Sequence, residues 1–188
     1  MTRLACVTGR FQPVHGQHLE LFEIALRGAD HLIVAVTNPD LGSRHEEPTS
    51  PHRHLGSANP FTYYERVRLL EAALAGAALT SRTTIVPFDL TRGEHWADYV
   101  PLHARHLVRA YSDWERHKAR LLSDAGYQVS VLEGDPATKL SSSEIRDRIE
   151  HGHPWAELVP SAVIPVLTGL LPGRPARLAE PAVGSGDR

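Results

Sequence analysis

The sequence has few of the features that would place the protein outside the cell, in a membrane or on nucleic acid. Its one cysteine, Cys6, cannot form an internal disulfide, which favours a reducing compartment. No apolar run approaches the length of a membrane span, and the first ten residues lack the apolar core of a signal peptide. A formal net charge of −2 gives no basic excess for bulk nucleic-acid binding. We therefore expect a soluble, cytoplasmic protein that binds neither membranes nor nucleic acids.

Two common phosphate-binding motifs are also missing. Neither the G-x-G-x-x-G spacing of dinucleotide-binding turns nor the GK[ST] ending of a P-loop occurs in the chain. A zinc site has little support, because the pair His15 and His18 lacks the four-residue step that points two ligands from one helical face. No protein-built metal site is predicted. Any phosphate that the protein handles must be bound by local groups.

Apolar runs and helical periodicities alternate along the chain. Short apolar runs predict buried strands, and apolar residues at steps of three and four predict helices. The strands are predicted over residues 3–8, 31–37, 83–90, 105–112 and 127–133. This alternation predicts an α/β fold, with a parallel sheet covered by helices on both faces and a ligand site at the carboxyl ends of the strands.

The length of the chain suits one compact domain, which we expect to cover residues 1–171. Residues 38–60 contain four prolines and no apolar period, which predicts a long loop of the kind that forms a lid or a binding loop or is disordered. Residues 172–188 are rich in Pro, Gly and Ala and are predicted to form a disordered tail.

The stretch GRFQPVHGQHLELFE, residues 9–23, joins the first predicted strand to the first predicted helix. Gly9 permits a close backbone approach to a ligand, and Arg10 offers a planar guanidinium to phosphate oxygens. His15 and His18 flank the start of the helix, where unpaired N–H groups and the helix dipole favour an anion. Such imidazoles could stabilise charge on a transferring phosphate. The alternative is that both are ordinary polar residues at a helix start.

A second helix start of related chemistry is predicted within TKLSSSEIRDRI, residues 138–149. The serines at 141–143 precede Glu144 and are expected to include the helix cap. Capping does not account for Arg146, because a cation early in a helix opposes the helix dipole unless an anion is nearby. Two anion-binding helix starts that face each other across the sheet edge predict a shared triphosphate site.

Four fragments of the chain, taken in order, resemble the nucleotidyltransferase superfamily that carries a (T/H)xGH motif after its first strand and an SSTxIR-like motif near its C-terminus. They are GRFQPVHGQHLE, NPFTYYERV, HWADYV and SSSEIRDRIEHGHPWAELVPSAV, and they span about residues 3–170. Within the superfamily the sequence is most similar to archaeal-type nicotinamide mononucleotide adenylyltransferases. The resemblance implies a five-stranded, Rossmann-like HxGH nucleotidyltransferase fold.

The resemblance also implies an enzyme that transfers AMP from ATP to nicotinamide mononucleotide, forming NAD and releasing pyrophosphate. Its partners would be a nucleoside triphosphate and a small phosphorylated acceptor, and relatives often form homo-oligomers. Mg²⁺ would enter with the nucleotide, held mainly by phosphates and water. The implied catalytic residues are His15, His18, Arg10 and Arg146; the implied nucleotide-binding residues are Gly9, Phe11, Gln12, Ser142 and Ser143; the implied acceptor-binding residues are Trp96, Asn59 and Phe61.

Trp96 falls where family members place a tryptophan against the nicotinamide ring, and stacking suits a flat cationic pyridinium. The alternative is an aromatic side chain that packs in the core.

Three departures from the family pattern concern substrate choice. The order HGQH puts Gln17 where the family has glycine before the second histidine, so we expect a displaced nucleotide or an altered choice of base. The family's SGNP-like segment has become YSDW at 111–114, and an arginine expected before NPF is missing. An alternative is therefore a cytidylyltransferase that uses CTP and a phosphonate or another small phosphorylated metabolite. An alternative of another class is a nucleotide-sensing protein with weakened turnover.

Overall fold

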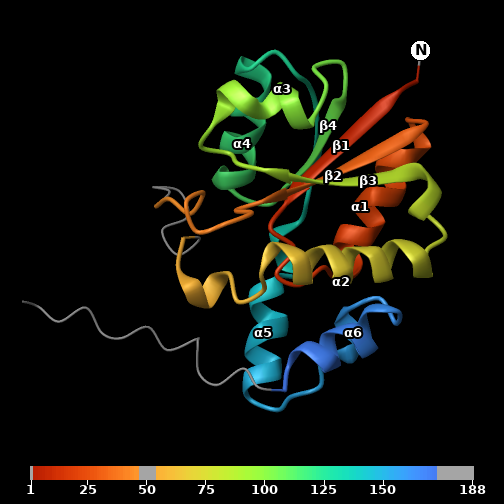
Figure 1. Ribbon diagram of the computed structural model, residues 1–188, viewed down its shortest axis with the longest axis vertical. Coiled ribbons are helices and arrows are strands. Elements are labelled where there is room, and N and C mark those ends of the chain that lie inside the picture. Colours follow the sequence, from red (N-terminus) through yellow and green to blue (C-terminus); the bar gives the residue numbers. More distant parts are fainter. Residues whose placement is uncertain (1, 47–53, 173–188) are drawn as a thin grey trace, which may run out of the picture.

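Five parallel strands form one sheet in the computed structural model, which describes residues 2–46 and 54–172 (Figure 1). The order across the sheet is β3-β2-β1-β4-β5, which confirms the predicted α/β class. The strands predicted over 83–90 and 105–112 end two residues earlier than expected, because turns follow them. The bounds are β1 Leu4–Gly9, β2 His31–Thr37, β3 Thr83–Phe88, β4 Arg105–Ala110 and β5 Gln128–Glu133.

Side chains cap several of the helix starts. Thr62 and Glu65 form the predicted capping box at the start of α2: the Glu65 backbone N–H donates to the Thr62 hydroxyl, and the Thr62 backbone N–H donates to the Glu65 carboxylate. The α-helices are α1 Gly16–Arg27, α2 Tyr63–Gly76, α3 Trp96–Tyr99, α4 Asp113–Asp124, α5 Ser142–Glu150 and α6 Val163–Leu170. Short 3₁₀ turns cover Gly56–Ala58, Thr80–Arg82, Gly93–His95, Pro136–Thr138 and Ala156–Leu158.

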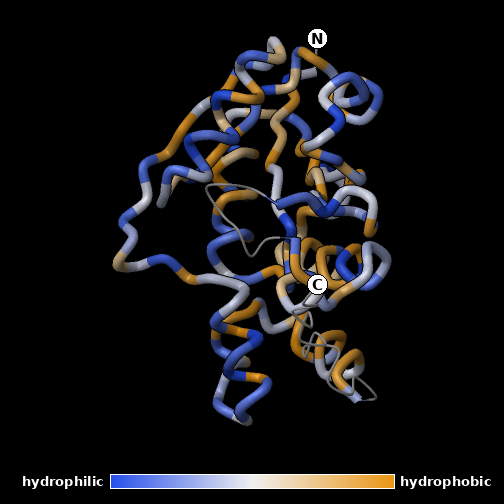
Figure 2. Tube along the Cα trace, turned by 90° about the vertical axis from the view of Figure 1, so that its left-hand side faces the viewer, coloured by the Kyte–Doolittle hydropathy of each residue, from blue (hydrophilic) through white to orange (hydrophobic). Residues whose placement is uncertain are grey.

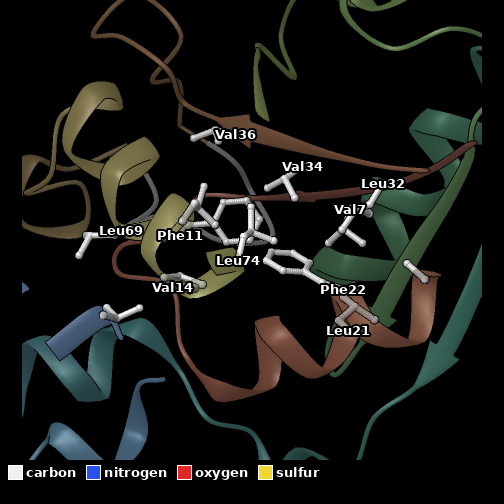
Figure 3. Close-up of a cluster of buried hydrophobic side chains, with 14 of the residues drawn as sticks. Val7, Phe11, Val14, Leu21, Phe22, Leu32, Val34, Val36, Leu69 and Leu74 are labelled. Atoms are coloured by element: carbon white, nitrogen blue, oxygen red, sulfur yellow. The ribbon is translucent and has the colours of Figure 1, made fainter. Parts of the chain in front are cut away.

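Each face of the sheet has its own core. Successive strand residues point to opposite faces, so Val7 joins the cluster under α1 and α2 while Cys6 joins the cluster under α3 and α4. Figure 3 shows Phe11, Phe22 and Leu74 meeting in the first cluster. Hydrophobic residues run through the middle of the molecule and also along the helix at the lower right of Figure 2. Both faces are therefore covered, as predicted.

The sheet opens between β1 and β4. The β1–β2 ladder runs the full length of β1, from Leu4 to Gly9. The β1–β4 ladder has only two residue pairs, Ala5 with Arg105 and Cys6 with His106. Connections leave β1 and β4 in opposite directions across the sheet, and in α/β folds this reversal is where ligands bind. The predicted crevice thus lies beyond Cys6 and His106.

Within 2–46 and 54–172, no helix is long and apolar enough to cross a membrane. The predicted loop over 38–60 contains the 3₁₀ turn at Gly56–Ala58, and its part at 47–53 lies outside the described residues. The predicted C-terminal tail lies outside them too, apart from Pro172.

Candidate active site

A cavity of about 270 Å³ lies at the opening between β1 and β4. Its walls come from the ends of these two strands, from the start of α1, from α4, and from the segment before α5. The position is the one predicted from the order of elements. The predicted site residues that line the cavity are Gly9, Arg10, Phe11, His15, His18, Ser142 and Ser143.

The two histidines form a stacked pair at the start of α1. His15 is the N-cap residue in an extended conformation, and the ring centroids of His15 and His18 lie 3.7 Å apart. The His15 backbone N–H donates to Nδ1 of His18 at 3.3 Å. Because Nδ1 accepts this bond, the proton of neutral His18 must be on Nε2. His18 therefore does cap the helix start, in line with the alternative of ordinary polar residues there, and both histidines also line the cavity.

Burial keeps both imidazoles uncharged. It lowers the pKa of His15 to about 3, and the His15 Nδ1 atom is buried without a hydrogen-bond partner among the described residues. Burial, followed by electrostatic repulsion from His15 in its protonated form, Lys118 and Arg109, lowers the pKa of His18 well below its usual range. At neutral pH the pair can therefore offer hydrogen bonds to a phosphate but no positive charge.

Phe11 fixes the orientation of His18. Its ring is 1% exposed and meets the His18 ring edge-on, with 4.9 Å between centroids. A Cβ at residue 9 would lie 2.8 Å from that ring, so Gly9 is needed to admit it. Phe11 itself adopts a left-handed φ of 52°. In this structure the predicted nucleotide-binding pair Gly9 and Phe11 thus shapes the wall that carries His18.

The second motif fragment holds the first one in place. The Gln12 side-chain amide donates to the Phe61 carbonyl and accepts from the Phe61 N–H, both at 2.9 Å. Arg66 is fully buried and donates to the carbonyls of Arg10 and Thr37 at 2.9 and 2.7 Å. These bonds fix the turn that presents Arg10 to the cavity. The Arg66 contribution was not anticipated from the sequence.

Of the residues implied to bind ligands, Gln12, Asn59 and Phe61 do not line the cavity that the described residues form. All three are buried, with exposed fractions of 1%, 4% and 2%. The Asn59 amide donates to the Leu55 carbonyl at 2.9 Å. Their direct ligand contacts stay a prediction, and their visible role is to join the segment before α2 to the turn after β1.

The start of α5 binds the same turn from the other side. Ser141 is the cap residue, and its hydroxyl accepts from the Glu144 N–H. The Ser142 hydroxyl donates to the Pro13 carbonyl at 2.9 Å. The Arg146 guanidinium donates to the Gln12 carbonyl at 2.8 Å and to the Ser143 hydroxyl at 3.0 Å. The two predicted helix starts therefore converge, through direct hydrogen bonds.

Arg146 lies behind the cavity wall that Ser143 forms. Burial lowers the pKa of Arg146 to about 10, so the guanidinium stays charged at neutral pH. Its positive charge can act on a phosphate in the cavity, while its N–H groups hold the wall together.

Gln17 forms a partition in the site. Its Nε2 donates to the Thr138 carbonyl at 2.7 Å, and its Oε1 accepts from the Leu140 N–H at 2.9 Å and from the Tyr111 hydroxyl at 3.0 Å. Gln17, Arg109 and Tyr111 line both the main cavity and a second, more open hollow. The side chain that replaces the expected glycine thus separates two spaces.

Trp96 packs in the core on the α3 and α4 face. Its ring is 5% exposed and lies 5.4 Å from the Phe88 ring, centroid to centroid. The indole N–H donates to the Asp89 carbonyl at 2.7 Å. Trp96 is not among the cavity-lining residues in the described part of the chain. Its position is that of an aromatic side chain packed in the core, and its contact with an acceptor stays a prediction.

Lys118 is a cavity residue that the motifs did not reveal. It is 9% exposed, and its Nζ donates to the Thr8 carbonyl at 3.1 Å. A signal was present in the sequence: Trp114, Lys118 and Leu122 follow one another at four-residue steps, so a lysine occupies the buried face of α4.

Two further basic residues line the cavity within ion pairs. The Arg109 guanidinium lies 2.8 Å from the Glu20 carboxylate, and the Lys139 ammonium lies 3.0 Å from the Glu115 carboxylate. Across residues 2–46 and 54–172, no group of three or more His, Cys, Asp or Glu side chains could hold a metal ion.

Comparisons with known proteins identify the family. A family model described as cytidylyltransferase-like matches residues 6–148. A phosphonoformate cytidylyltransferase from Streptomyces viridochromogenes is 38% identical over 162 residues, which cover 86% of this chain and 88% of the relative. A nicotinamide-nucleotide adenylyltransferase from Thermococcus kodakarensis is 33% identical over 165 residues, which cover 87% and 81%. These relatives confirm the predicted class, a nucleotidyltransferase.

The fold also matches a solved structure. A bifunctional NMN adenylyltransferase/ADP ribose pyrophosphatase from Francisella tularensis superposes with a TM-score of 0.60 at 18% identity. The match covers 85% of this chain and 45% of that larger protein, so this chain spans less than half of its length. At this identity the likeness supports the fold alone.

Proposed function

Because this chain belongs to the cytidylyltransferase-like family, we propose that it transfers CMP from CTP to a small phosphonate or phosphorylated acid. The observation that supports CTP over ATP is the position of the Gln17 side chain between the two hollows. Its carboxamide occupies a backbone acceptor, the Thr138 carbonyl, and a backbone donor, the Leu140 N–H. These groups could otherwise read the edge of a base.

The partition also limits the size of the base. Gln17, bonded to the Tyr111 hydroxyl, lines both the main cavity and the second hollow and therefore lies at their boundary. The Tyr111 ring packs so closely against Gly134 that no Cβ would fit at residue 134, so the ring is also held from its other side. A pyrimidine needs less room than a purine beside such a wall. The relative from S. viridochromogenes, named for cytidylyl transfer, supports the same choice.

The reaction needs no covalent enzyme intermediate. An oxygen of the acceptor's phosphonate or phosphate attacks the α-phosphorus of the nucleotide and forms the new P–O bond. The bond from that phosphorus to the bridging oxygen breaks, and pyrophosphate leaves with the electron pair. His15 and His18 donate hydrogen bonds to the phosphates, while Arg10 and Arg146 supply positive charge. Catalysis is then positioning and electrostatic stabilisation.

Mg²⁺ bound to the triphosphate would add further positive charge. The cavity fits a metal ion carried by the nucleotide, because its lining is mainly basic, hydroxyl-bearing and aromatic, and its carboxylate Glu115 is already bonded to Lys139 and Ser112. A cytoplasmic location and homo-oligomers stay predictions.

A second candidate is the transfer of AMP from ATP to nicotinamide mononucleotide, which forms NAD. The adenylyltransferase relative from T. kodakarensis supports it. The position of Trp96 gives it no support, because the ring that would stack on nicotinamide is packed against Phe88.

The test is pyrophosphate release from CTP or ATP, each with Mg²⁺ and each paired with phosphonoformate, other small phosphonates or nicotinamide mononucleotide. Release with CTP and a phosphonate supports the proposal. Release only with ATP and nicotinamide mononucleotide replaces it by the second candidate. Nucleotide binding without release in any pairing would favour the nucleotide sensor.

The Gln17→Gly variant tests the partition directly. We expect it to raise the ratio of ATP to CTP turnover by about tenfold, the order of discrimination that pocket shape provides. Tyr111→Phe, which removes only the hydroxyl bonded to Gln17, should change the ratio less. An unchanged ratio in Gln17→Gly would remove the partition as the basis of base choice.

A further inference from the structure

Lys118 lies where a lysine is costly. It is on the face of α4 that packs against the sheet, between Trp114 and Leu122, and it is 9% exposed. Burial of an ammonium costs several kcal/mol unless an anion or strong acceptors compensate it. A well-packed apolar residue would satisfy the fold at this place. The presence of lysine therefore points to a role beyond packing.

The ammonium sits in the opening of the sheet. β1 and β4 stop pairing after Cys6 and His106, and Thr8 lies in the separated part of β1. Nζ of Lys118 donates to the Thr8 carbonyl at 3.1 Å and is therefore anchored between the two strands. Its charge contributes to the lowered pKa of His18, which places the two groups near each other in the same cavity.

The two lysines of the chain both lie at this cavity. Of the 20 Lys and Arg residues only two are lysines, Lys118 and Lys139, and both line it. The chain uses arginine at all its other basic positions. An ammonium is a compact point charge suited to single phosphate oxygens, whereas a guanidinium is a planar fork suited to paired ones. Lys139 pairs with Glu115, and Lys118 is the more deeply buried of the two.

The cavity needs permanent charge from residues other than its histidines. Uncharged imidazoles can donate hydrogen bonds to a triphosphate but cannot neutralise it. We propose that Lys118 is a phosphate-binding residue, whose ammonium, held by the Thr8 carbonyl, binds an oxygen of the nucleotide's phosphates beside His18. This inference rests on the proposed function, because it assigns a group to the same nucleotide.

Titration calorimetry with inorganic pyrophosphate and with CTP, on the full chain, tests the assignment without turnover. Lys118→Met keeps the length of the side chain and removes its charge. We expect it to weaken pyrophosphate binding by about tenfold or more, which corresponds to about 1.4 kcal/mol. Lys118→Arg should restore a large part of the affinity. Arg120→Met, which removes one charge from the exposed face of the same helix, is the matched control and should stay within about twofold of wild type.

The competing explanation is that Lys118 only satisfies the Thr8 carbonyl. In that case Lys118→Met changes the midpoint of thermal unfolding and leaves pyrophosphate affinity within about twofold of wild type, which would overturn the proposal. If Lys118→Met does not fold, acetylation of wild type serves instead. Pyrophosphate should slow the acetylation of Lys118, read by peptide mass spectrometry, and an unchanged rate counts against the proposal.

The two proposals fail in different ways. A wild-type chain that binds pyrophosphate through Lys118 and transfers nucleotide in no pairing contradicts the proposed function alone. Turnover of CTP or ATP that is indifferent to Lys118→Met contradicts the Lys118 assignment alone. A wild-type chain that binds neither pyrophosphate nor CTP contradicts both.

Discussion

The two helix starts at the cavity use polar residues in different ways. At the start of α1, His15 and His18 stack on each other and face the cavity. At the start of α5, Ser142 and Arg146 donate to backbone carbonyls of the turn after β1. Both starts were expected to grip phosphate directly. We therefore expect the α1 start to act mainly on the substrate, and the α5 start to act mainly by fixing the turn after β1, with the charge of Arg146 as its contribution to the chemistry.

The substitution with the largest expected effect on this comparison is His18→Ala. If the α1 start carries the chemistry, loss of the imidazole should lower kcat by about 10²–10³-fold, the usual cost of removing a preorganised donor to the transition state. Pyrophosphate release under saturating substrate gives kcat. His103→Ala, at an exposed histidine, is the control. A loss in His18→Ala no larger than in the control would break the comparison.

Acid should destabilise the α1 start and spare the α5 start. The pKa of His15 is lowered to about 3, below its unfolded value of 6.5, so the unfolded chain binds more protons between these values and stability falls as the pH decreases through this window. At pH 4.5 the loss that comes from His15 alone should be about 2 to 3 kcal/mol, and urea unfolding across pH measures the total loss. Arg146 keeps its charge throughout.

His106 must be separated from this effect. It is fully buried with both ring nitrogens unpartnered among the described residues, and burial lowers its pKa to about 3. In a His106→Phe variant, the loss of stability that remains at low pH measures the contribution of the α1 start. If His106→Phe alone removes all of it, the assignment to His15 is wrong.

Arg146→Ala tests the geometric role of the α5 start. Removal of the guanidinium leaves the Gln12 carbonyl without this donor, and we expect about 1–3 kcal/mol less stability, together with lower activity. Denaturant unfolding and kcat/KM are measured on the same preparations. Arg148→Ala, which breaks surface ion pairs of the same helix, should cost less. A loss of activity with unchanged stability would assign Arg146 to chemistry instead.

Ser142→Ala should have the smallest effect. It removes one hydrogen bond, from the hydroxyl to the Pro13 carbonyl, at a cost of about 1 kcal/mol of stability. Thermal unfolding compares it with Ser123→Ala, at an exposed serine of α4. A large fall in kcat with little loss of stability would show that Ser142 contacts the substrate and acts like the α1 histidines.

Much of the fold was readable from local patterns. The strand over 31–37 was predicted with its observed bounds, because seven mostly apolar residues between two polar segments admit few other readings. The capping box of Thr62 and Glu65 was predicted for the same local reason. The sheet order is set by long-range pairing, which no local pattern shows; the resemblance to a known family implied five strands and a Rossmann-like sheet.

The parts of the site that lie at helix starts were predictable from the sequence. The parts formed by residues far apart in the chain were not. Gln17 and Thr138 are 121 residues apart in the chain, and no local pattern shows that their groups meet. Lys118 was missed because one lysine in an apolar stripe is usually read as exposed, whereas the opening of the sheet gives it a carbonyl partner. The sequence allowed Trp96 either to stack on an acceptor or to pack in the core, and only the structure shows that its side chain is buried.

The short ladder between β1 and β4 has a mechanical consequence. It joins β3, β2 and β1 on one side to β4 and β5 on the other through two residue pairs. A nucleotide in the cavity would touch both sides, at Gly9 and at Arg109. Substrate would therefore act as a cross-link between two half-sheets, and the loaded protein would be a stiffer body than the empty one.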